Sequence, residues 1–149
     1  EKEGHGQVDY AALWDRHPDE RATHQTIDMH VRMARAHGRV WSVTDTPGNP
    51  RFGRNLLAGL GAADVVLLVV DATRGVFEQH LEDGANGVRS QTREQLCMAY
   101  ALGAKQMVVA VAKMDAVSYS RDRFDEVTAA VGAAVRKSGL PPACARYVP

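Results

Sequence analysis

The chain is poor in cysteine and in aromatic side chains. Its 149 residues include only two cysteines, Cys97 and Cys144, and 6% aromatic residues. Two cysteines cannot form the network of disulfides that stabilises small secreted domains. Residues 1–5 also lack the apolar core of a signal peptide. We therefore expect a reducing, intracellular compartment and a cytoplasmic location.

Neither sign of charge dominates, because 18 Lys and Arg residues are balanced by 18 Asp and Glu residues. A neutral chain argues against a domain that binds nucleic acid through bulk positive charge alone. Long apolar runs are absent as well: the longest aliphatic stretch, Val65–Val70, is far too short to cross a bilayer, so we expect no membrane contact. The 45% hydrophobic and 24% charged residues are typical of a globular domain, and the length suffices for one core.

The pattern of apolar residues first predicts a β-hairpin. Apolar and polar residues alternate with a period of two from Thr26 to Ala34, which is typical of a half-buried strand. A turn over Ala36–Arg39 separates this stretch from a second strand over Val40–Asp45. We therefore expect the two strands to pair antiparallel.

The rest of the chain alternates between helices and strands. The predicted elements are a helix over Pro50–Gly61, a strand over Asp64–Asp71, a loop over Ala72–Ser90, a helix over Gln91–Leu102, a strand over Gln106–Val111, a helix over Ser120–Ser138 and a strand beginning at Arg146. The strands are continuous apolar runs, which is typical of parallel sheets covered on both faces. This order predicts a three-layer α/β domain.

One candidate site follows the second strand of the hairpin, at Asp45-Thr46-Pro47-Gly48. Ligands bind at the carboxyl ends of strands in open α/β sheets. Asp45 can reach Mg²⁺ through a water, and the Gly48 amide can donate to a terminal phosphate with no side chain in the way. Taken alone, Asp-x-x-Gly also occurs at ordinary strand-to-turn junctions.

A second candidate site follows the strand Gln106–Val111, at Ala112-Lys113-Met114-Asp115. Guanine-nucleotide-binding domains carry Asn-Lys-x-Asp at such a place. There the lysine stem lies over the base and the aspartate accepts two hydrogen bonds from guanine, which adenine cannot supply. Taken alone, Lys-x-Asp is also a common surface pattern.

Together with their flanking residues, these patterns resemble one family, the elongation-factor-1-alpha type of translational GTPase. The matching segments are Val43–Asn49, Asn55–Gly75, Gln91–Glu94, Leu102–Val109 and Ala112–Asp115, with Tyr119, Ser120, Arg123, Phe124 and Glu126 at the start of the last helix. The resemblance runs from about Leu13 to Pro149. It implies a three-layer, P-loop-GTPase-like α/β domain with a mostly parallel sheet and an antiparallel hairpin at its edge.

The family delivers aminoacyl-tRNA to the ribosome as a GTP complex and hydrolyses GTP on codon recognition. The resemblance therefore implies GTP or GDP and Mg²⁺ as ligands, and the ribosome and aminoacyl-tRNA as partners. It assigns nucleotide contacts to Gly48, Lys113 and Asp115. Because residues 19–28 align with the family's Glu-Arg-x-Arg-Gly-Ile-Thr-Ile-Asp, it also assigns Thr26, which by pattern alone is an ordinary strand-start residue, to Mg²⁺ together with Asp45.

Three departures from the family bear on catalysis. The sequence contains no Gly-x-x-x-x-Gly-Lys-[Ser/Thr] motif, the P-loop that cradles the β- and γ-phosphates. Asn49 stands where the family has the histidine that orients the attacking water, and asparagine cannot titrate in that role. Ala112 replaces the asparagine that braces the nucleotide pocket. GTP hydrolysis therefore stays open, and we expect Asn49 to impair it.

We divide the chain into an irregular, switch-I-like segment, 1–25, and a GTPase-like α/β domain, 26–149. The sequence lacks the family's first strand, P-loop and last guanine-loop motif, and without that strand two apolar strands would each present an unpaired edge. We therefore expect either a longer chain or another polypeptide that fills the gap. The alternative function, with no cofactor, is a degenerate pseudo-GTPase that serves as a structural or interaction module for protein partners in a larger assembly.

Overall fold

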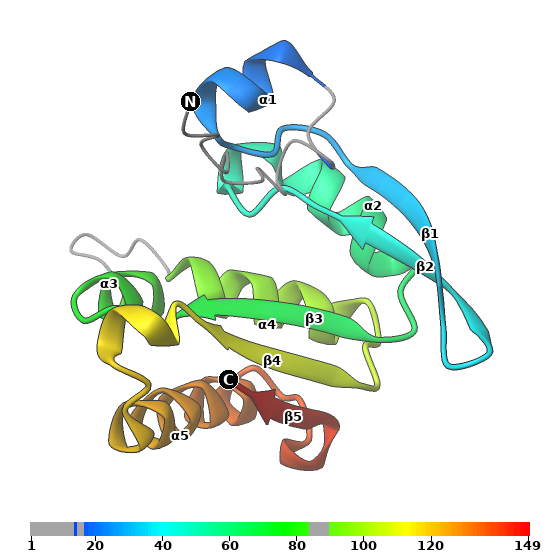
Figure 1. Ribbon diagram of the computed structural model, residues 1–149. Coiled ribbons are helices and arrows are strands. Elements are labelled where there is room, and N and C mark those ends of the chain that lie inside the picture. Colours follow the sequence, from blue (N-terminus) through cyan, green and yellow to red (C-terminus); the bar gives the residue numbers. More distant parts are fainter. Residues whose placement is uncertain (1–13, 15–16, 84–89) are drawn as a thin grey trace, which may run out of the picture. The chain divides into compact units, whose positions relative to one another are not determined.

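The computed structural model describes residue 14 and the ranges 17–83 and 90–149. The chain divides into two compact units, Glu1–Gly59 and Leu60–Pro149 (Figure 1). The first unit contains an antiparallel hairpin and the second a parallel sheet, so the predicted α/β class is confirmed. No helix in the described ranges is long and apolar enough to cross a bilayer.

The hairpin of the first unit consists of β1, over His30–Ala36, and β2, over Arg39–Asp45. The strands pair antiparallel as predicted, with His30 opposite Asp45. His37 and Gly38 form the turn between them, with φ angles of 50° and 71°. A positive φ at both positions is what a type I′ hairpin turn requires, and a two-residue turn of this kind fixes the register of the strands.

Short helical segments flank this hairpin: α1 over Pro18–Thr23, a 3₁₀ turn over Pro50–Phe52, and α2 over Gly53–Gly61. The sequence predicts a single helix over Pro50–Gly61, whereas the structure has a 3₁₀ turn followed by α2 there. Helix α1 differs from the irregular structure expected up to residue 25, because Pro18 suits a first helical position and Glu20 accepts the His17 N–H. Residues 1–13 and 15–16 of the segment expected to be irregular lie outside the described residues.

Helix α2 packs closely against the segment that follows β2. Gly59 is buried, and a Cβ atom at this position would lie 2.3 Å from Thr46 Cγ2 and 3.3 Å from Thr44 Cγ2. A glycine permits this approach because it has no Cβ. The helix thereby supports the strand end that carries Asp45.

The described part of the second unit contains a parallel sheet in the order β3 (Val66–Asp71), β4 (Met107–Ala112) and β5 (Ala145–Val148). All three strands lie close to the apolar runs that predicted them. Asp71 is opposite Ala112, so the chain leaves β3 and β4 at the same level of the sheet. This register brings Asp71 next to Lys113.

The helices of the second unit, within the described residues, are α3 over Val76–Leu81, α4 over Gln91–Ala101 and α5 over Arg121–Lys137. Helices α4 and α5 match the predicted helices, and the hydroxyl groups of Ser90 and Ser120 cap their first turns. The loop predicted over Ala72–Ser90 is wrong for residues 76–81. Helix α3 forms there because Phe77 is buried and Glu78 accepts the Gly75 N–H.

The core of the second unit lies between one face of the sheet and these helices. Its enclosed side chains include Leu96, Val109, Val111, Val127, Val131 and Val135. On the opposite face, Leu67 and Val69 are 62% and 60% exposed. The continuous apolar run of β3 predicts helices on both faces of the sheet. Among the described residues, helices cover only one of these faces.

Candidate functional site

Thr26 and Asp45, the predicted Mg²⁺ ligands, lie next to each other in the first unit. The Thr26 hydroxyl donates a hydrogen bond of 3.4 Å to Asp45 Oδ2, although the residues are far apart in sequence. Both side chains are half-buried. The fold therefore presents two oxygen atoms from separate segments at one point, an arrangement that suits a hard cation.

Glu20 holds the segment that carries Thr26. Its fully buried carboxylate accepts hydrogen bonds from the N–H groups of Ile27 (2.9 Å) and Asp28 (3.0 Å), the two residues after Thr26. His17 N–H and the His30 ring add two more partners, at 3.1 and 3.0 Å. Burial raises the pKa of Glu20, but these hydrogen bonds outweigh burial and lower the pKa to about 2.

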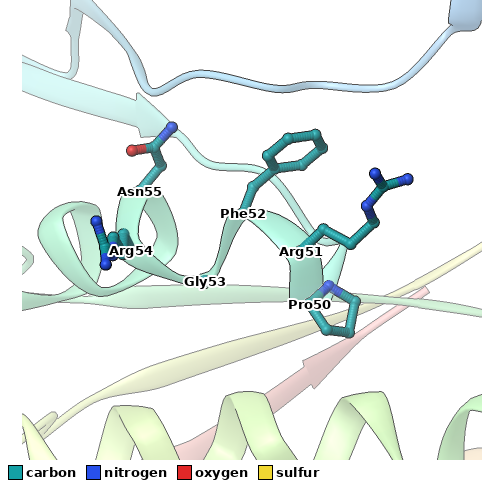
Figure 2. A pocket seen from close by; sticks show the side chains of 6 residues that line it. All are labelled: Pro50, Arg51, Phe52, Gly53, Arg54 and Asn55. Atoms are coloured by element: carbon teal, nitrogen blue, oxygen red, sulfur yellow. The ribbon is translucent and has the colours of Figure 1, made fainter.

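Asn55, at the start of α2, ties the same segment to the helix. Its side-chain Nδ2 donates to the Ile27 carbonyl at 2.9 Å and to Asp28 Oδ1 at 3.3 Å. Figure 2 shows Asn55 and Phe52 projecting from the same side of this helical stretch. The hollow drawn there is lined by six consecutive residues, 50–55, so it belongs to one helix start and brings no distant groups together.

Gly48 and Asn49 follow Asp45 in the same unit. Gly48 is exposed and has no side chain that could block an approaching phosphate. The Asn49 side-chain oxygen accepts the Arg51 N–H at 3.0 Å and so caps the 3₁₀ turn that precedes α2. The residue at the family's histidine position therefore has a structural role that its sequence position did not indicate.

In the second unit, Lys113 forms an ion pair with Asp71 at the carboxyl ends of β4 and β3. Lys113 Nζ lies 2.7 Å from Asp71 Oδ2, and the Thr73 N–H donates to Asp71 Oδ1 at 2.8 Å. Burial raises the pKa of Asp71, but the hydrogen bonds from Lys113 and Thr73 outweigh it and lower the pKa to about 2. Asp71 therefore stays ionised and fixes the lysine ammonium.

The loop from Lys113 to Tyr119 presents Asp115 to solvent. Lys113, Ser118 and Tyr119 have φ angles of 58°, 53° and 51°, a left-handed conformation that non-glycine residues adopt infrequently. Asp115 lies in the 3₁₀ turn between them and is exposed. The loop thus holds an ammonium and a carboxylate two residues apart on one short turn.

Neither Asp71 nor Glu20 is assigned a role from the sequence. For Asp71, the sequence does offer an indication. Asp71 ends one predicted strand, Lys113 follows the next, and neighbouring parallel strands end at the same edge of a sheet. For Glu20, the indication is an acidic residue three positions after His17, where a carboxylate can close a capping box.

Each of the two candidate sites, taken by itself, offers groups of the type that a guanine base or Mg²⁺ would contact. The exposed Asp115 carboxylate can accept from guanine, and the Lys113 side chain, 66% exposed, presents its stem to a base. Within the described ranges, no group of three or more His, Cys, Asp and Glu side chains could hold a metal. Thr26 and Asp45 would therefore share the ion with phosphate and water oxygens, as Mg²⁺ prefers.

Known proteins with similar sequences include elongation factors 1-alpha from several organisms. Elongation factor 1-alpha of Entamoeba histolytica is 36% identical over 146 residues, which are 98% of this chain and 32% of that protein. Elongation factor 1-alpha of Plasmodium falciparum is 39% identical over 136 residues, which are 91% of this chain and 30% of that protein. The chain thus spans about a third of the length of these relatives.

Two solved structures share the fold. A bacterial selenocysteine-specific elongation factor, EF-Sec, matches with a TM-score of 0.70 and 24% identity over 91% of this chain and 21% of that one. SelB of Methanococcus maripaludis matches with a TM-score of 0.56 and 16% identity over 72% of this chain and 21% of that one.

The family model of the elongation factor Tu GTP-binding domain matches residues 1–143. The chain belongs to the elongation factor Tu GTP-binding domain family.

Proposed function

We propose that this domain binds GTP and GDP, and that the 113–115 turn selects guanine. Asp115 accepts hydrogen bonds from the guanine N1 and N2 groups, and the Lys113 stem covers the base. The observation that carries this proposal is the Lys113–Asp71 ion pair of 2.7 Å, which fixes the lysine on the same turn as an exposed carboxylate. Adenine offers no matching pair of donors, so Asp115 provides the selection.

Thr26 and Asp45 are proposed to bind Mg²⁺, and Gly48 to lie against the terminal phosphate. When bound, Mg²⁺ neutralises phosphate charge and orients the phosphate oxygens. The chain's own contribution is to hold two oxygen atoms 3.4 Å apart, with Glu20 and Asn55 fixing the backbone on either side of Ile27. Asn49 can orient a water by hydrogen bonding but cannot exchange a proton at neutral pH, so hydrolysis is proposed to be slow.

The protein that contains this domain is proposed to act in translation, delivering aminoacyl-tRNA to the ribosome in the cytoplasm. Its relatives named elongation factor 1-alpha support this proposal. The proposal rests on family membership, because this chain spans only about a third of the length of those relatives.

Calorimetry of the protein that contains this domain tests the nucleotide proposal. We expect Mg·GDP to bind more tightly than Mg·ADP, and Asp115→Ala to weaken GDP about tenfold or more without changing ADP binding. Each hydrogen bond to a charged acceptor contributes roughly 1.5–3 kcal/mol, and 1.4 kcal/mol is a factor of ten.

Asp122→Ala is the matched control, because Asp122 is an exposed carboxylate on α5. It should leave the affinities for GDP and ADP unchanged. Equal affinity for GDP and ADP in the unaltered protein would contradict the role of Asp115. Absence of binding to either nucleotide would replace the proposal with that of an interaction module.

A further inference from the structure

Arg123, on the first turn of α5, is a buried cation that the proposed nucleotide site does not use. Its side chain is 1% exposed. Its guanidinium reaches three partners: Nε donates to the Ala72 carbonyl at 2.8 Å, Nη2 to Glu78 at 2.8 Å, and Nη1 lies 2.9 Å from Glu126. The guanidinium also lies 5.4 Å from the centroid of the Phe77 ring.

Burial of an arginine is unfavourable unless its charge is paired, and an apolar side chain of similar volume could join α3 to α5 as well. The two carboxylate partners are partly exposed, at 37% and 51%. The bond to the Ala72 carbonyl is different, because it is buried and reaches a backbone atom in the turn after β3. That bond indicates what the arginine does beyond joining two helices.

Ala72 belongs to the turn that aims Asp71 at Lys113. The Ala72 N–H donates to the Ala112 carbonyl at 2.9 Å, and the Thr73 N–H donates to Asp71 Oδ1 at 2.8 Å. With the Arg123 bond, three backbone groups of this turn are held, namely the N–H and carbonyl of Ala72 and the N–H of Thr73. The position of the Asp71 carboxylate, and hence of the Lys113 ammonium, depends on that turn.

We propose that Arg123 is a positioning residue, whose Nε–H bond to the Ala72 carbonyl fixes the turn after β3 so that Asp71 holds Lys113. The interpretation that this arrangement positions Lys113 for contact with a base rests on the proposed function. The effect of Arg123 on the position of Lys113 does not depend on the proposed function, because it is a property of the nucleotide-free protein. It is therefore measured without nucleotide.

The Lys113 ammonium group provides a direct readout. The sequence has lysine at positions 2, 105, 113 and 137 alone, so few side-chain ¹⁵N–¹H signals at low pH and temperature come from this part of the protein. The signal that disappears in Lys113→Arg identifies Lys113. Because Lys113 is ion-paired, we expect its ammonium protons to exchange with water more slowly than those of the exposed Lys105.

Two substitutions separate the bond to Ala72 from the ion pairs. Arg123→Met keeps the stem that packs near Phe77 but has no donor, and we expect exchange at Lys113 to quicken about fivefold, as for loss of one net hydrogen bond. Arg123→Gln places its amide nitrogen where Nε was, so it keeps a donor for Ala72 while removing the charge. We expect Arg123→Gln to retain slow exchange.

Arg121→Ala is the matched control, because Arg121 lies two residues away, is 83% exposed and pairs with Asp125. It should leave the Lys113 signal unchanged. Slow exchange in both Arg123 variants, or fast exchange in both, would overturn the proposal. If Arg123→Met does not fold, Arg123→Leu, which also has no donor, takes its place in the same comparison with Arg123→Gln. Failure of guanine binding with this coupling intact would overturn the proposed function alone.

Discussion

At the scale of single residues, the carboxylate of Glu20 organises more backbone than its place in a six-residue helix suggests. It receives N–H groups from both sides of the segment that carries Thr26, together with the His30 ring. A carboxylate that accepts several hydrogen bonds is stabilised in its ionised form, and this stabilisation appears as a lowered pKa. Its contribution to folding is therefore coupled to pH.

We expect Glu20→Gln to lower the free energy of unfolding at pH 7 by about 2 kcal/mol, as for hydrogen bonds to a charged group. The folded pKa of Glu20, about 2, lies below the ordinary value of 4.5. Its stabilising effect is thus fully present above pH 4.5 and is lost as the pH falls toward 2. Urea unfolding at several pH values should show the difference between unaltered protein and variant narrowing over this window. A constant difference would show that ionisation of Glu20 is not involved.

Asn49 provides a second test at this scale. If the protein binds GTP, Asn49→His should raise single-turnover hydrolysis at least about tenfold with little change in nucleotide affinity, because a water-orienting base acts on the transition state. Asn49→Ser is the control, since serine can cap the 3₁₀ turn but brings no ring. An equal rate increase in both variants would assign the effect to the helix start instead.

At the scale of elements, the hairpin and the longer helices could be predicted from sequence because their apolar residues recur at one period, and the parallel strands because each is a continuous apolar run. Helix α3 could not, because its six residues make fewer than two turns and show no helical period, and its stability comes from burial of Phe77 and a cap at Gly75. The alternation in β1 predicts a half-buried strand, yet Val31 and Met33 are 50% and 69% exposed. Periodicity reports which residues share a face, and it does not report what covers that face.

Some residues of the candidate site could likewise be predicted from sequence, and others could not. Thr26, Asp45, Lys113 and Asp115 could be found from motif and resemblance. The Asp71–Lys113 ion pair depends on the register of β3 against β4, which no local pattern in either strand determines. Glu20 was missed because three of its partners are backbone N–H groups, and only that of His17, three residues before it, leaves a capping pattern in the sequence.

The contact between α2 and the segment after β2 gives a prediction about elements. Gly59→Ala would place a methyl group 2.3 Å from Thr46 Cγ2, so we expect destabilisation of about 1–3 kcal/mol through overpacking. Gly61→Ala, on the same helix, meets nothing within 4 Å and should be neutral or stabilising. Thr46→Ser removes the methyl group and should reduce the cost of Gly59→Ala in a double-mutant cycle. Equal stabilities of the two alanine variants would contradict the close approach.

At the scale of the whole molecule, apolar burial is distributed unevenly. Among the described residues, the buried hydrophobic cluster lies in the second unit, whereas β1 and β2 are largely exposed. Regions with few buried apolar contacts open at lower free energy than the core. The two units should therefore differ in local stability.

Native-state hydrogen exchange of the intact protein measures this difference. We expect the amides of Val109 and Val111 in β4 to be protected far more strongly than those of Arg32 and Val43, which pair across the hairpin. Addition of Mg·GDP should raise protection near Asp45 if nucleotide binds there. Uniform protection across both units would indicate a single cooperative structure.

The parallel pairing of β3 with β4 also has a consequence for synthesis. The hairpin pairs neighbouring segments and is complete once Asp45 has emerged, but β3 must wait for the whole crossover through α3 and α4 before β4 arrives. At 5–20 residues per second this wait is on the order of seconds. During that time the Val65–Val70 stretch is an extended apolar segment with an unpaired edge, the form most exposed to misassociation. That edge of β3 is paired only after Met107–Ala112 has emerged.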